Sequence, residues 1–400
     1  MALSVAEALE KIVADVTPTA AELVPIANAA GRILAEPIAA RLTQPPFDAS
    51  AMDGYAVRAA NVAHLPVTLE VIGQAAAGHP FGGEVATGEA VRIFTGAPLP
   101  SGTDAIVIQE NTCASGSTVE VREAQPDPGH IRRRGFDFQQ SELLLAPGRK
   151  LGPRELTLAA AAGHGTLPVR RRPVVAVLAT GDELVPPGTL PGPGQIVCSN
   201  PLGVAALLTQ AGAEAKLAGI ARDNRDSLIQ HVEAVRDADI LVTIGGASVG
   251  DHDLVAPVLQ SLGMTLAFWK IAMRPGKPLL HGRLGQQRVV GLPGNPVSAL
   301  ICTRVFLVPL VRALLGLPPE KAGTETASLA VPVEANGPRQ HYMRATLDRG
   351  PEGRPVVRPA RSQDSSLLSP LAAADVLVVR PPGAPALPAG ADVPILHLDF

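Results

Sequence analysis

The stretch VVAVLATGDEL, residues 174–184, sets the fold class of this chain. Its first six residues form an apolar run that predicts a strand, and the polar residues Thr180, Asp182 and Glu183 follow at once. Strands that alternate with helices indicate a parallel sheet with crossover connections. The alternating segments downstream are predicted helices at 201–210 and 225–237 and predicted strands at 216–220 and 239–244.

The pattern differs on either side of this α/β region. Between 47 and 140 the chain has short β-rich runs divided by glycine and proline, and similar runs return after residue 320. Near the N-terminus, spaced apolar residues predict helices at 5–16 and 26–34. The chain is therefore predicted to be a multidomain α/β plus β protein. Its predicted domains are an N-terminal helical and linker domain (1–46 and 141–170), an inserted β-domain (47–140), the α/β domain (171–319) and a C-terminal β-domain (320–400).

Composition excludes some classes of function. The chain has 400 residues, of which 46% are hydrophobic, and its 34 basic and 37 acidic residues give a formal charge of -3. This balance argues against a protein that holds nucleic acid by bulk electrostatics. The first twenty residues carry four charges and do not form a signal peptide, so a cytoplasmic location is predicted. The apolar segment 297–315 contains Arg304 and Arg312, which favours a buried helix over a membrane span.

The three cysteines do not predict a metal site. Cys113, Cys198 and Cys302 are scattered and lack the spacing of zinc ligands, so we expect buried, reduced thiols. Neither a phosphate-binding G-x-x-x-x-G-K-[ST] loop nor a G-x-S-x-G nucleophile elbow occurs. These absences exclude the usual P-loop nucleotide hydrolases and α/β-hydrolases.

Polar and glycine-rich segments follow three of the predicted strands. In an open parallel sheet ligands bind beyond the carboxyl ends of the strands, and glycines let backbone N–H groups approach a ligand closely. We therefore predict a ligand site at this edge. Its predicted substrate-binding residues are Thr180, Asp182, Gly245, Gly246, Ser248, Pro293, Gly294, Asn295 and Pro296, and its predicted catalytic residues are Glu183 and Asp253.

Each of these segments also has a purely structural interpretation. Thr180 to Asp182 is compatible with a simple turn, and Asp253 is compatible with a helix cap. Pro296 suits the first turn of a helix, so 293–296 is also compatible with a rigid helix start. The presence of three such segments on one sheet edge favours function.

A cationic group follows, with Lys270, Arg274 and Lys277 close together in sequence. Three cations beside a glycine loop suit an anionic ligand with several phosphates. The alternative is a solvated surface run.

The inserted β-domain adds Asp53, Thr95 and Asp137, all at loop positions. Asp53 precedes a glycine, so it is also compatible with a tight turn. Together with Glu183 and Asp253, these aspartates suit a hard cation such as Mg²⁺, which takes oxygen ligands and bridges phosphates. Asp53, Glu183 and Asp253 are the predicted metal ligands.

Six motifs in order along the chain resemble the molybdopterin molybdenumtransferase family, and the likeness runs from about residue 5 to 400. In the C-terminal part, Ser362 to Ser366 depart from the glycine-serine-glycine of that family. The motifs are Ala51-Met52-Asp53-Gly54-Tyr55, Thr95-Gly96-Ala97, Thr180-Gly181-Asp182-Glu183-Leu184, Ser248-Val249-Gly250, Pro275-Gly276-Lys277-Pro278 and Leu292-Pro293-Gly294-Asn295-Pro296.

The resemblance implies an elongated homodimer of four-domain subunits with a β-barrel-like C-terminal domain, in which Asp53 reaches the partner's site. It implies insertion of molybdate into adenylylated molybdopterin, with release of AMP and with Mg²⁺ assisting. The resemblance assigns catalytic positions to Asp53, Asp137, Glu183 and Asp253. Implied partners are a molybdopterin adenylyltransferase and proteins that accept the cofactor. Neither a membrane nor nucleic acid is implied.

Three other functions stay open from sequence. The same architecture also occurs in scaffold proteins that anchor other proteins. Tungstate is a tetrahedral dianion of nearly the same size as molybdate, and the α/β domain also suits the preceding adenylylation of molybdopterin.

Overall fold

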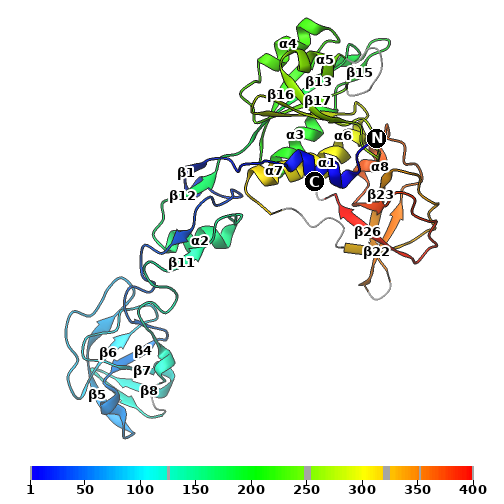
Figure 1. Cartoon of the computed structure of the whole chain (residues 1–400). Helices are drawn as coiled ribbons and strands as arrows, with labels where there is room; N and C mark the ends of the chain where they lie inside the picture. Colours follow the sequence, from blue (N-terminus) through cyan, green and yellow to red (C-terminus); the bar gives the residue numbers. More distant parts are fainter. Residues whose placement is uncertain (1, 124–126, 247–253, 319–324, 351–352, 399–400) are drawn as a thin grey trace. The chain divides into compact units, whose positions relative to one another are not determined.

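The computed structural model describes residues 2–123, 127–246, 254–318, 325–350 and 353–398. The chain forms two compact units, which Figure 1 colours along the sequence. One unit comprises Met1–Glu22 with Arg170–Phe400, and the other comprises Leu23–Val169. Ser248 and Asp253 of the predicted site lie outside the described residues.

A mixed six-stranded sheet, ordered β16-β13-β17-β21-β20-β18, forms the centre of the first unit. The first four strands are parallel, as predicted, whereas β20 and β18 add an antiparallel edge. A tight turn at Gly285 joins β20 to β21, which leaves no room for a crossover helix. The strands are β13 (Val174–Thr180), β16 (Glu214–Ala221), β17 (Ile240–Ile244), β18 (Met264–Trp269), β20 (Leu280–Leu284) and β21 (Gln287–Leu292).

Helices cover both faces of this sheet (Figure 1). The helices α4 (Arg225–Glu233) and α5 (Val255–Ser261) pack with the sheet in one apolar core. The other face carries α1 (Val5–Val13), α3 (Asn200–Gln210), α6 (Pro296–Cys302) and α7 (Val308–Leu314). A π-helical turn, Thr303–Leu307, joins α6 to α7. In the resulting helix Pro296–Leu314, 72% of the most apolar window is buried, which confirms the predicted core helix.

The C-terminal strands close into a five-stranded barrel, as predicted. The ring runs β23-β24-β22-β26-β25 and returns to β23, and the short strand β19 (Met273–Arg274) pairs alongside β23. Closure leaves the barrel strands paired on both sides around one apolar core. The elements are β22 (Glu325–Leu329), β23 (Gln340–Arg349), β24 (Pro355–Pro359), α8 (Leu368–Ala372), β25 (Val376–Arg380) and β26 (Asp392–His397).

The second unit contains a six-stranded sheet ordered β7-β4-β6-β5-β9-β8 and several two-stranded pairs. The sheet strands are β4 (Gly54–Val57), β5 (Val67–Ala75), β6 (Glu89–Ile93), β7 (Ala105–Ile108), β8 (Thr112–Ser115) and β9 (Thr118–Val121). The paired strands are β1 (Ala21–Pro25) with β12 (Thr166–Arg170), β2 (Ile38–Ala39) with β11 (Leu143–Leu145) and β3 (Ala49–Ser50) with β10 (Ile131–Arg132), beside the helix α2 (Pro153–Ala161).

Two sequence expectations were wrong in this unit. The predicted helix at 26–34 is a 3-10 turn at Ile26–Asn28 followed by extended chain, in which the Leu34 N–H donates to the Arg149 carbonyl. Backbone partners distant in sequence override the helical spacing of its apolar residues. Cys113 is exposed on β8, whereas Cys198 and Cys302 are buried as expected.

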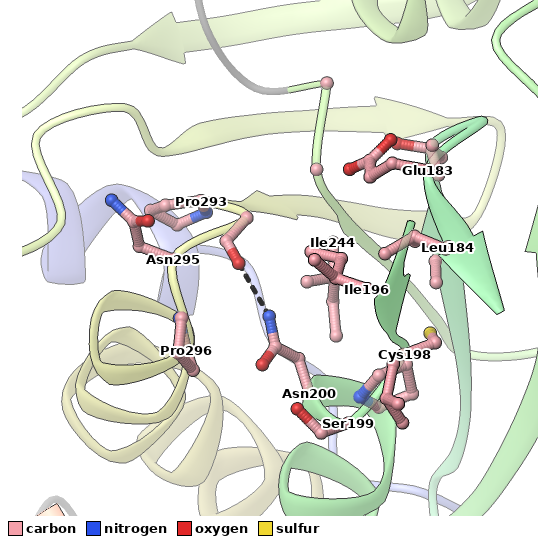
Figure 2. Close-up of a pocket in the computed structure, with 18 of the residues that line it drawn as sticks. Glu183, Leu184, Ile196, Cys198, Ser199, Asn200, Ile244, Pro293, Asn295 and Pro296 are labelled. Atoms are coloured by element: carbon pink, nitrogen blue, oxygen red, sulfur yellow. Dashed lines mark hydrogen bonds between the residues drawn. The ribbon is translucent and has the colours of Figure 1, made fainter. Parts of the chain in front are cut away.

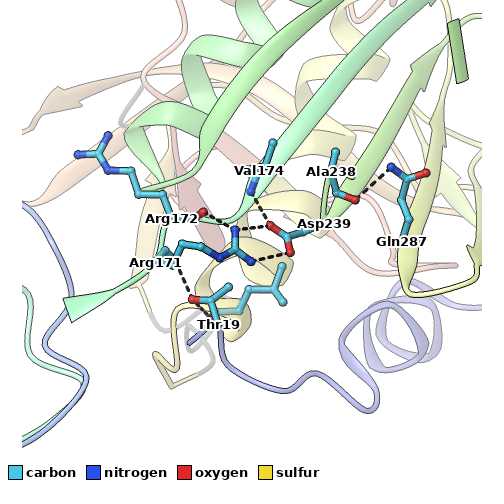
Figure 3. A network of polar contacts seen from close by, with 8 residues as sticks. Thr19, Arg171, Arg172, Val174, Ala238, Asp239 and Gln287 are labelled. Carbon is cyan, nitrogen blue, oxygen red and sulfur yellow. Dashed lines mark hydrogen bonds and ion pairs between the residues drawn. The ribbon is translucent and has the colours of Figure 1, made fainter. Parts of the chain in front are cut away.

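Figure 3 shows how the amino end of β13 is tied to the chain on either side of it. The Arg171 guanidinium makes two hydrogen bonds of 2.8 and 2.9 Å to the Asp239 carboxylate, which also accepts the Val174 N–H at 2.7 Å. The Thr19 hydroxyl donates to the Arg171 carbonyl at 2.6 Å. These bonds hold the start of β13 beside the start of β17.

Candidate functional site

A pocket of about 820 Å³ opens at the carboxyl ends of the parallel strands, at the predicted edge. Figure 2 shows Glu183, Leu184 and Ile196 on one side of it and Pro293, Asn295 and Pro296 on the other. The structure therefore brings together eight of the predicted residues, which come from three separate segments. They are Thr180, Glu183, Gly245, Gly246, Pro293, Gly294, Asn295 and Pro296.

Glu183 owes its position to the glycine two residues before it. Gly181 has a φ of +154°, and a Cβ added there would lie 2.5 Å from Glu183 Oε2, so the carboxylate folds against bare backbone. Burial raises the pKa of the Cys198 thiol, and the negative charge of Glu183 adds a smaller contribution. At neutral pH the pocket thus presents a protonated thiol.

Gly245 allows close approach of two strand ends. Its φ is +95°, and an added Cβ would lie 2.6 Å from the Thr180 carbonyl oxygen. The Thr180 side chain lies beneath this turn, with only 5% of its surface exposed. Within the described part of the chain, its hydroxyl has no hydrogen-bond partner. A buried hydroxyl without a partner is costly and is a natural contact for a ligand.

The 293–296 loop is held from two directions. The Asn200 side chain, at the start of α3, donates to the Gly294 carbonyl at 2.7 Å (Figure 2). On the barrel side, the Asn295 amide donates to the Ser365 hydroxyl at 3.1 Å, and neighbouring Ser366 lines the pocket. The helix α6 begins directly after this loop, so its N-terminus suits an anion.

None of the three predicted cations lines the pocket, although Lys270 lies at the same sheet edge. Lys270 directly follows β18, whose last residue pairs with the first residue of β20. The Ile271 N–H donates to the Lys277 carbonyl, and the next residue, Pro278, lines the pocket. Arg274 is exposed on β19. The edge therefore carries positive charge next to the pocket.

Asp182 has a supporting position. It is not among the pocket-lining residues, but its carboxylate accepts the Asp223 N–H at 3.3 Å and its carbonyl accepts Arg222 Nη1 at 3.1 Å. It thereby fixes the turn that carries Asp223.

In the second unit the structure joins Asp53 to Thr95. Asp53 Oδ1 accepts both the N–H and the hydroxyl of Thr95, each at 2.8 Å, and these bonds lower the pKa of Asp53. The Arg92 guanidinium, which lies 5.0 Å from the Tyr55 ring centre, adds a smaller attraction. Asp137 is exposed, and within the described part of this unit no hydrogen bond joins it to Asp53 or Thr95.

The donors in the pocket suit a hard cation better than a soft one. Glu183 and Asp223 offer carboxylate oxygens, and the Cys198 thiol is held protonated. The described residues contain no group of three or more histidine, cysteine, aspartate or glutamate side chains able to hold a metal. Such a set fits Mg²⁺, which binds through one or two carboxylates and takes its other ligands from water and substrate phosphates.

Sequence reasoning missed four polar residues that line the pocket. Asp223 lies just after β16, and its place at the carboxyl end of a predicted strand is a signal that could have identified it. Ser199 and Asn200 precede a proline at a helix start, which is a recognisable helix signal. Ser366 comes from the barrel segment that departs from the family motif, and local sequence carries no signal for it.

Family models cover most of the chain. Residues 176–313, which contain all of the pocket-lining residues except Ser366, match a probable molybdopterin binding domain. Residues 3–163 match the MoeA N-terminal region, described as domains I and II, and residues 326–398 match the MoeA C-terminal region, described as domain IV. The α/β unit and its pocket thus define a molybdopterin-binding class of protein.

Full-length relatives narrow this class. A molybdopterin molybdenumtransferase from Nostoc sp. is 38% identical, over 94% of this chain and 88% of the relative. One from Synechococcus elongatus is 35% identical over the whole of both chains. The crystal structure of a molybdopterin biosynthesis MoeA protein from Pyrococcus horikoshii matches with a TM-score of 0.86 at 33% identity, over 100% of both chains. The chain belongs to the molybdopterin molybdenumtransferase family of molybdenum cofactor biosynthesis.

Proposed function

We propose that the chain inserts molybdate into adenylylated molybdopterin and releases AMP. The observation that supports this most directly is the pocket, where Glu183 faces the 293–296 loop at the carboxyl edge of a sheet matched to a molybdopterin binding domain. An elongated anionic substrate needs both a loop that binds its phosphate and a carboxylate that binds a cation. Donors and a helix N-terminus hold phosphate oxygens, and carboxylates hold a cation beside them.

The chain's own residues have distinct roles in this proposal. The 293–296 loop and the N-terminus of α6 bind the phosphate of the pterin, and Gly245 and Gly246 let backbone approach the substrate. Lys270, Arg274 and Lys277 offset the charge of the molybdate and phosphate oxygens. Glu183 would hold Mg²⁺, and Asp53 and Asp253 are further predicted ligands. When bound, Mg²⁺ offsets negative charge on the phosphate oxygens.

Asp53, Thr95 and Asp137 remain predicted site residues of the second unit. The ionised state of Asp53 is supported by its two hydrogen bonds from Thr95, which favour the carboxylate. We also propose the homodimer that family resemblance implies and a cytoplasmic location. Sedimentation of the purified chain tests the dimer, and a single monomeric species would exclude it.

Glu183→Gln tests the proposed activity. The variant keeps the shape of the side chain and loses its charge, so cofactor formation from adenylylated molybdopterin, molybdate and Mg²⁺ should fall by about 100-fold. Glu214→Gln is the matched control, because Glu214 is exposed at the amino end of β16, away from the pocket. Equal activity of both variants would exclude a catalytic role for Glu183. Replacing molybdate by tungstate, or supplying ATP with molybdopterin, separates the two enzymatic alternatives.

A further inference from the structure

Two side chains of the C-terminal barrel each have a buried nitrogen without a partner. They are His341 on β23 and Arg380 on β25, of which 7% and 2% of the surface is exposed. Among the described residues, neither His341 Nε2 nor Arg380 Nη1 makes a hydrogen bond. Buried polar atoms almost always have a partner, so this pair points to a bound water or ion that contacts both nitrogens.

The two side chains face each other inside the barrel. His341 and Arg380 are directly opposite in the antiparallel pairing of β23 with β25. Residues opposite each other project from the same face of a sheet, with Cβ atoms about 5 Å apart. Met343 and Val378, two residues further along these strands, pack in the barrel core, so His341 and Arg380 project inward as well. The two nitrogens therefore lie at one end of the barrel interior.

Backbone groups hold the Arg380 guanidinium in place at this end. Arg380 Nη2 donates to the Pro385 carbonyl and lies 3.5 Å from the carbonyl oxygens of Glu334 and Ala384. The Asn336 amide donates to the Arg380 carbonyl at 3.0 Å and so joins the same loops to β25. The interior of a small barrel is filled by side chains, so the space that remains suits a ligand of about the size of a water molecule.

The charge of the barrel end decides which ligand fits. Burial and the charges of four arginines lower the pKa of His341 to about 4, so its ring is neutral at neutral pH, whereas Arg380 stays charged. Among the described residues, no carboxylate forms an ion pair with His341 or Arg380. A buried charge is costly unless a counter-charge balances it. A water would satisfy both nitrogens, but only a small anion would also balance the charge. The four arginines are Arg274, Arg339, Arg344 and Arg380.

We propose that this end of the barrel binds one chloride ion between His341 Nε2 and Arg380 Nη1. Arg380 donates to the ion through Nη1, and the neutral His341 ring donates through Nε2–H. The ion also offsets the repulsion among the arginines around His341, including Arg274, which pairs with His341 through β19 and β23. Neither His341 nor Arg380 lines the pocket, so the chloride site is separate from the proposed substrate site.

Bromide tests the site directly on the full chain. It has the charge of chloride and nearly its size, and it scatters X-rays anomalously. Crystals of the wild-type chain transferred from chloride to bromide should show an anomalous peak in contact with His341 Nε2 and Arg380 Nη1. A water at this position, or the absence of an anomalous peak there, would overturn the proposal.

Thermal unfolding tests the site in solution. The wild-type chain should unfold at a temperature about 3 °C higher in chloride than in gluconate of equal ionic strength, because an ion that binds only the folded chain stabilises it. Arg380→Met removes the charge and the donor, so this difference should vanish. Arg358→Met is the matched control, since Arg358 is exposed on β24 of the same barrel, and it should keep the wild-type difference.

His341→Phe tests the second donor. It keeps a ring in place and removes Nε2, so the chloride concentration needed for half of the stabilisation should rise by roughly 5-fold. Equal chloride dependence of the wild-type chain and Arg380→Met would contradict the proposal. If Arg380→Met does not fold, the bromide experiment decides alone, because it needs only the wild-type chain.

Discussion

Asp53 illustrates how a single neighbour can set the charge of a surface carboxylate. Its side chain is exposed in this unit, so burial does little to its pKa, and the hydrogen bonds from Thr95 lower it. Both bonds end on Oδ1, and within the described residues nothing donates to Oδ2. The carboxylate is thus fixed and ionised at neutral pH, with one oxygen open to a ligand.

Removing the Thr95 hydroxyl should raise the pKa of Asp53. Thr95→Val retains the backbone donor, which is the larger cause, and deletes the side-chain donor, so the pKa should rise part of the way to its ordinary value. Carbon-detected NMR titration of the Asp53 carboxyl measures the change. Thr118→Val is the control, because its hydroxyl donates to the Ser115 carbonyl instead. An unchanged titration in Thr95→Val would contradict this account.

Individual site residues were predictable where a local pattern carries the information. Strand-end polarity pointed to Glu183 and Thr180, and the structure places both in the pocket. Asp223 was not found although it follows a predicted strand and so had the same signal as Glu183. Ser366 was not found, because a barrel loop acquires its position only through tertiary packing. Asp182 was assigned to the ligand, yet its hydrogen bonds give it a supporting position.

At the scale of elements, the two ends of β13 have different tasks. Its carboxyl end carries Thr180 into the pocket, whereas its amino end is anchored by the Arg171–Asp239 ion pair. Asp239 precedes β17, so the pair aligns two adjacent strands whose far ends line the site. Loss of this ion pair is therefore expected to lower the stability of the fold more than the activity of the site.

Asp239→Ala tests the anchor. It removes the partner of Arg171 and of the Val174 N–H, so the free energy of unfolding should fall by about 2 kcal/mol. Lys216→Ala serves as the control, because its ion pair with Glu214 is more than half exposed on both sides, and a loss of about 0.5 kcal/mol or less is expected. Urea unfolding measures both. Equal losses would show that the Asp239 pair is no more than a surface contact.

Helices and strands were predicted correctly where the periodicity of the apolar residues agreed with the way the segment packs in the fold. The apolar runs gave β13 and β17 to within one residue, and the 297–315 helix is continuous. The antiparallel pair β18 and β20 was missed, because short runs divided by proline and glycine carry no sign of strand direction. The predicted helix at 26–34 was wrong. Its apolar residues have helical spacing, but most of the segment is extended and forms hydrogen bonds with backbone groups distant in sequence.

At the scale of the whole molecule, buried histidines link stability to acid. Burial lowers the pKa of His281 in the sheet to about 4, with smaller contributions from Arg288 and Arg283. Burial likewise lowers the pKa of His341 in the barrel to about 4, assisted by four arginines, Arg274 among them. Both side chains are therefore neutral in the folded chain at neutral pH.

The unfolded chain binds these protons first, near the ordinary histidine pKa of 6.5. The free energy of unfolding is thus highest above pH 6.5, where both histidines are neutral in the folded and the unfolded chain. It falls as the pH drops toward about 4, by on the order of 3 kcal/mol per histidine. Urea unfolding across this range measures the slope. His341→Gln should make it shallower, and a flat profile in the wild-type chain would contradict the prediction.

The order of domain types along the chain was readable from composition and periodicity, since the β-rich runs, the α/β alternation and the second β-rich region occur in turn. Barrel closure was predicted only from the family resemblance. The sequence pattern carries no sign of it, because pairing between β23 and β25 joins residues far apart in sequence. Of the two boundaries between the compact units, the one at Arg170 lies where the α/β pattern begins in the sequence, whereas the one after Glu22 has no local signal.

The hydrogen bond between Thr19 and Arg171 also bears on whether residues 23–169 can be removed. The chain leaves the α/β and barrel unit after Glu22 and re-enters it at Arg170, and this bond holds the two crossing points together. A segment whose ends meet can be added to a folded unit, or deleted from it, with little disturbance. Residues 23–169 therefore form an insertion whose ends lie close together, and a chain in which a short flexible linker replaces them is expected to retain the remaining fold.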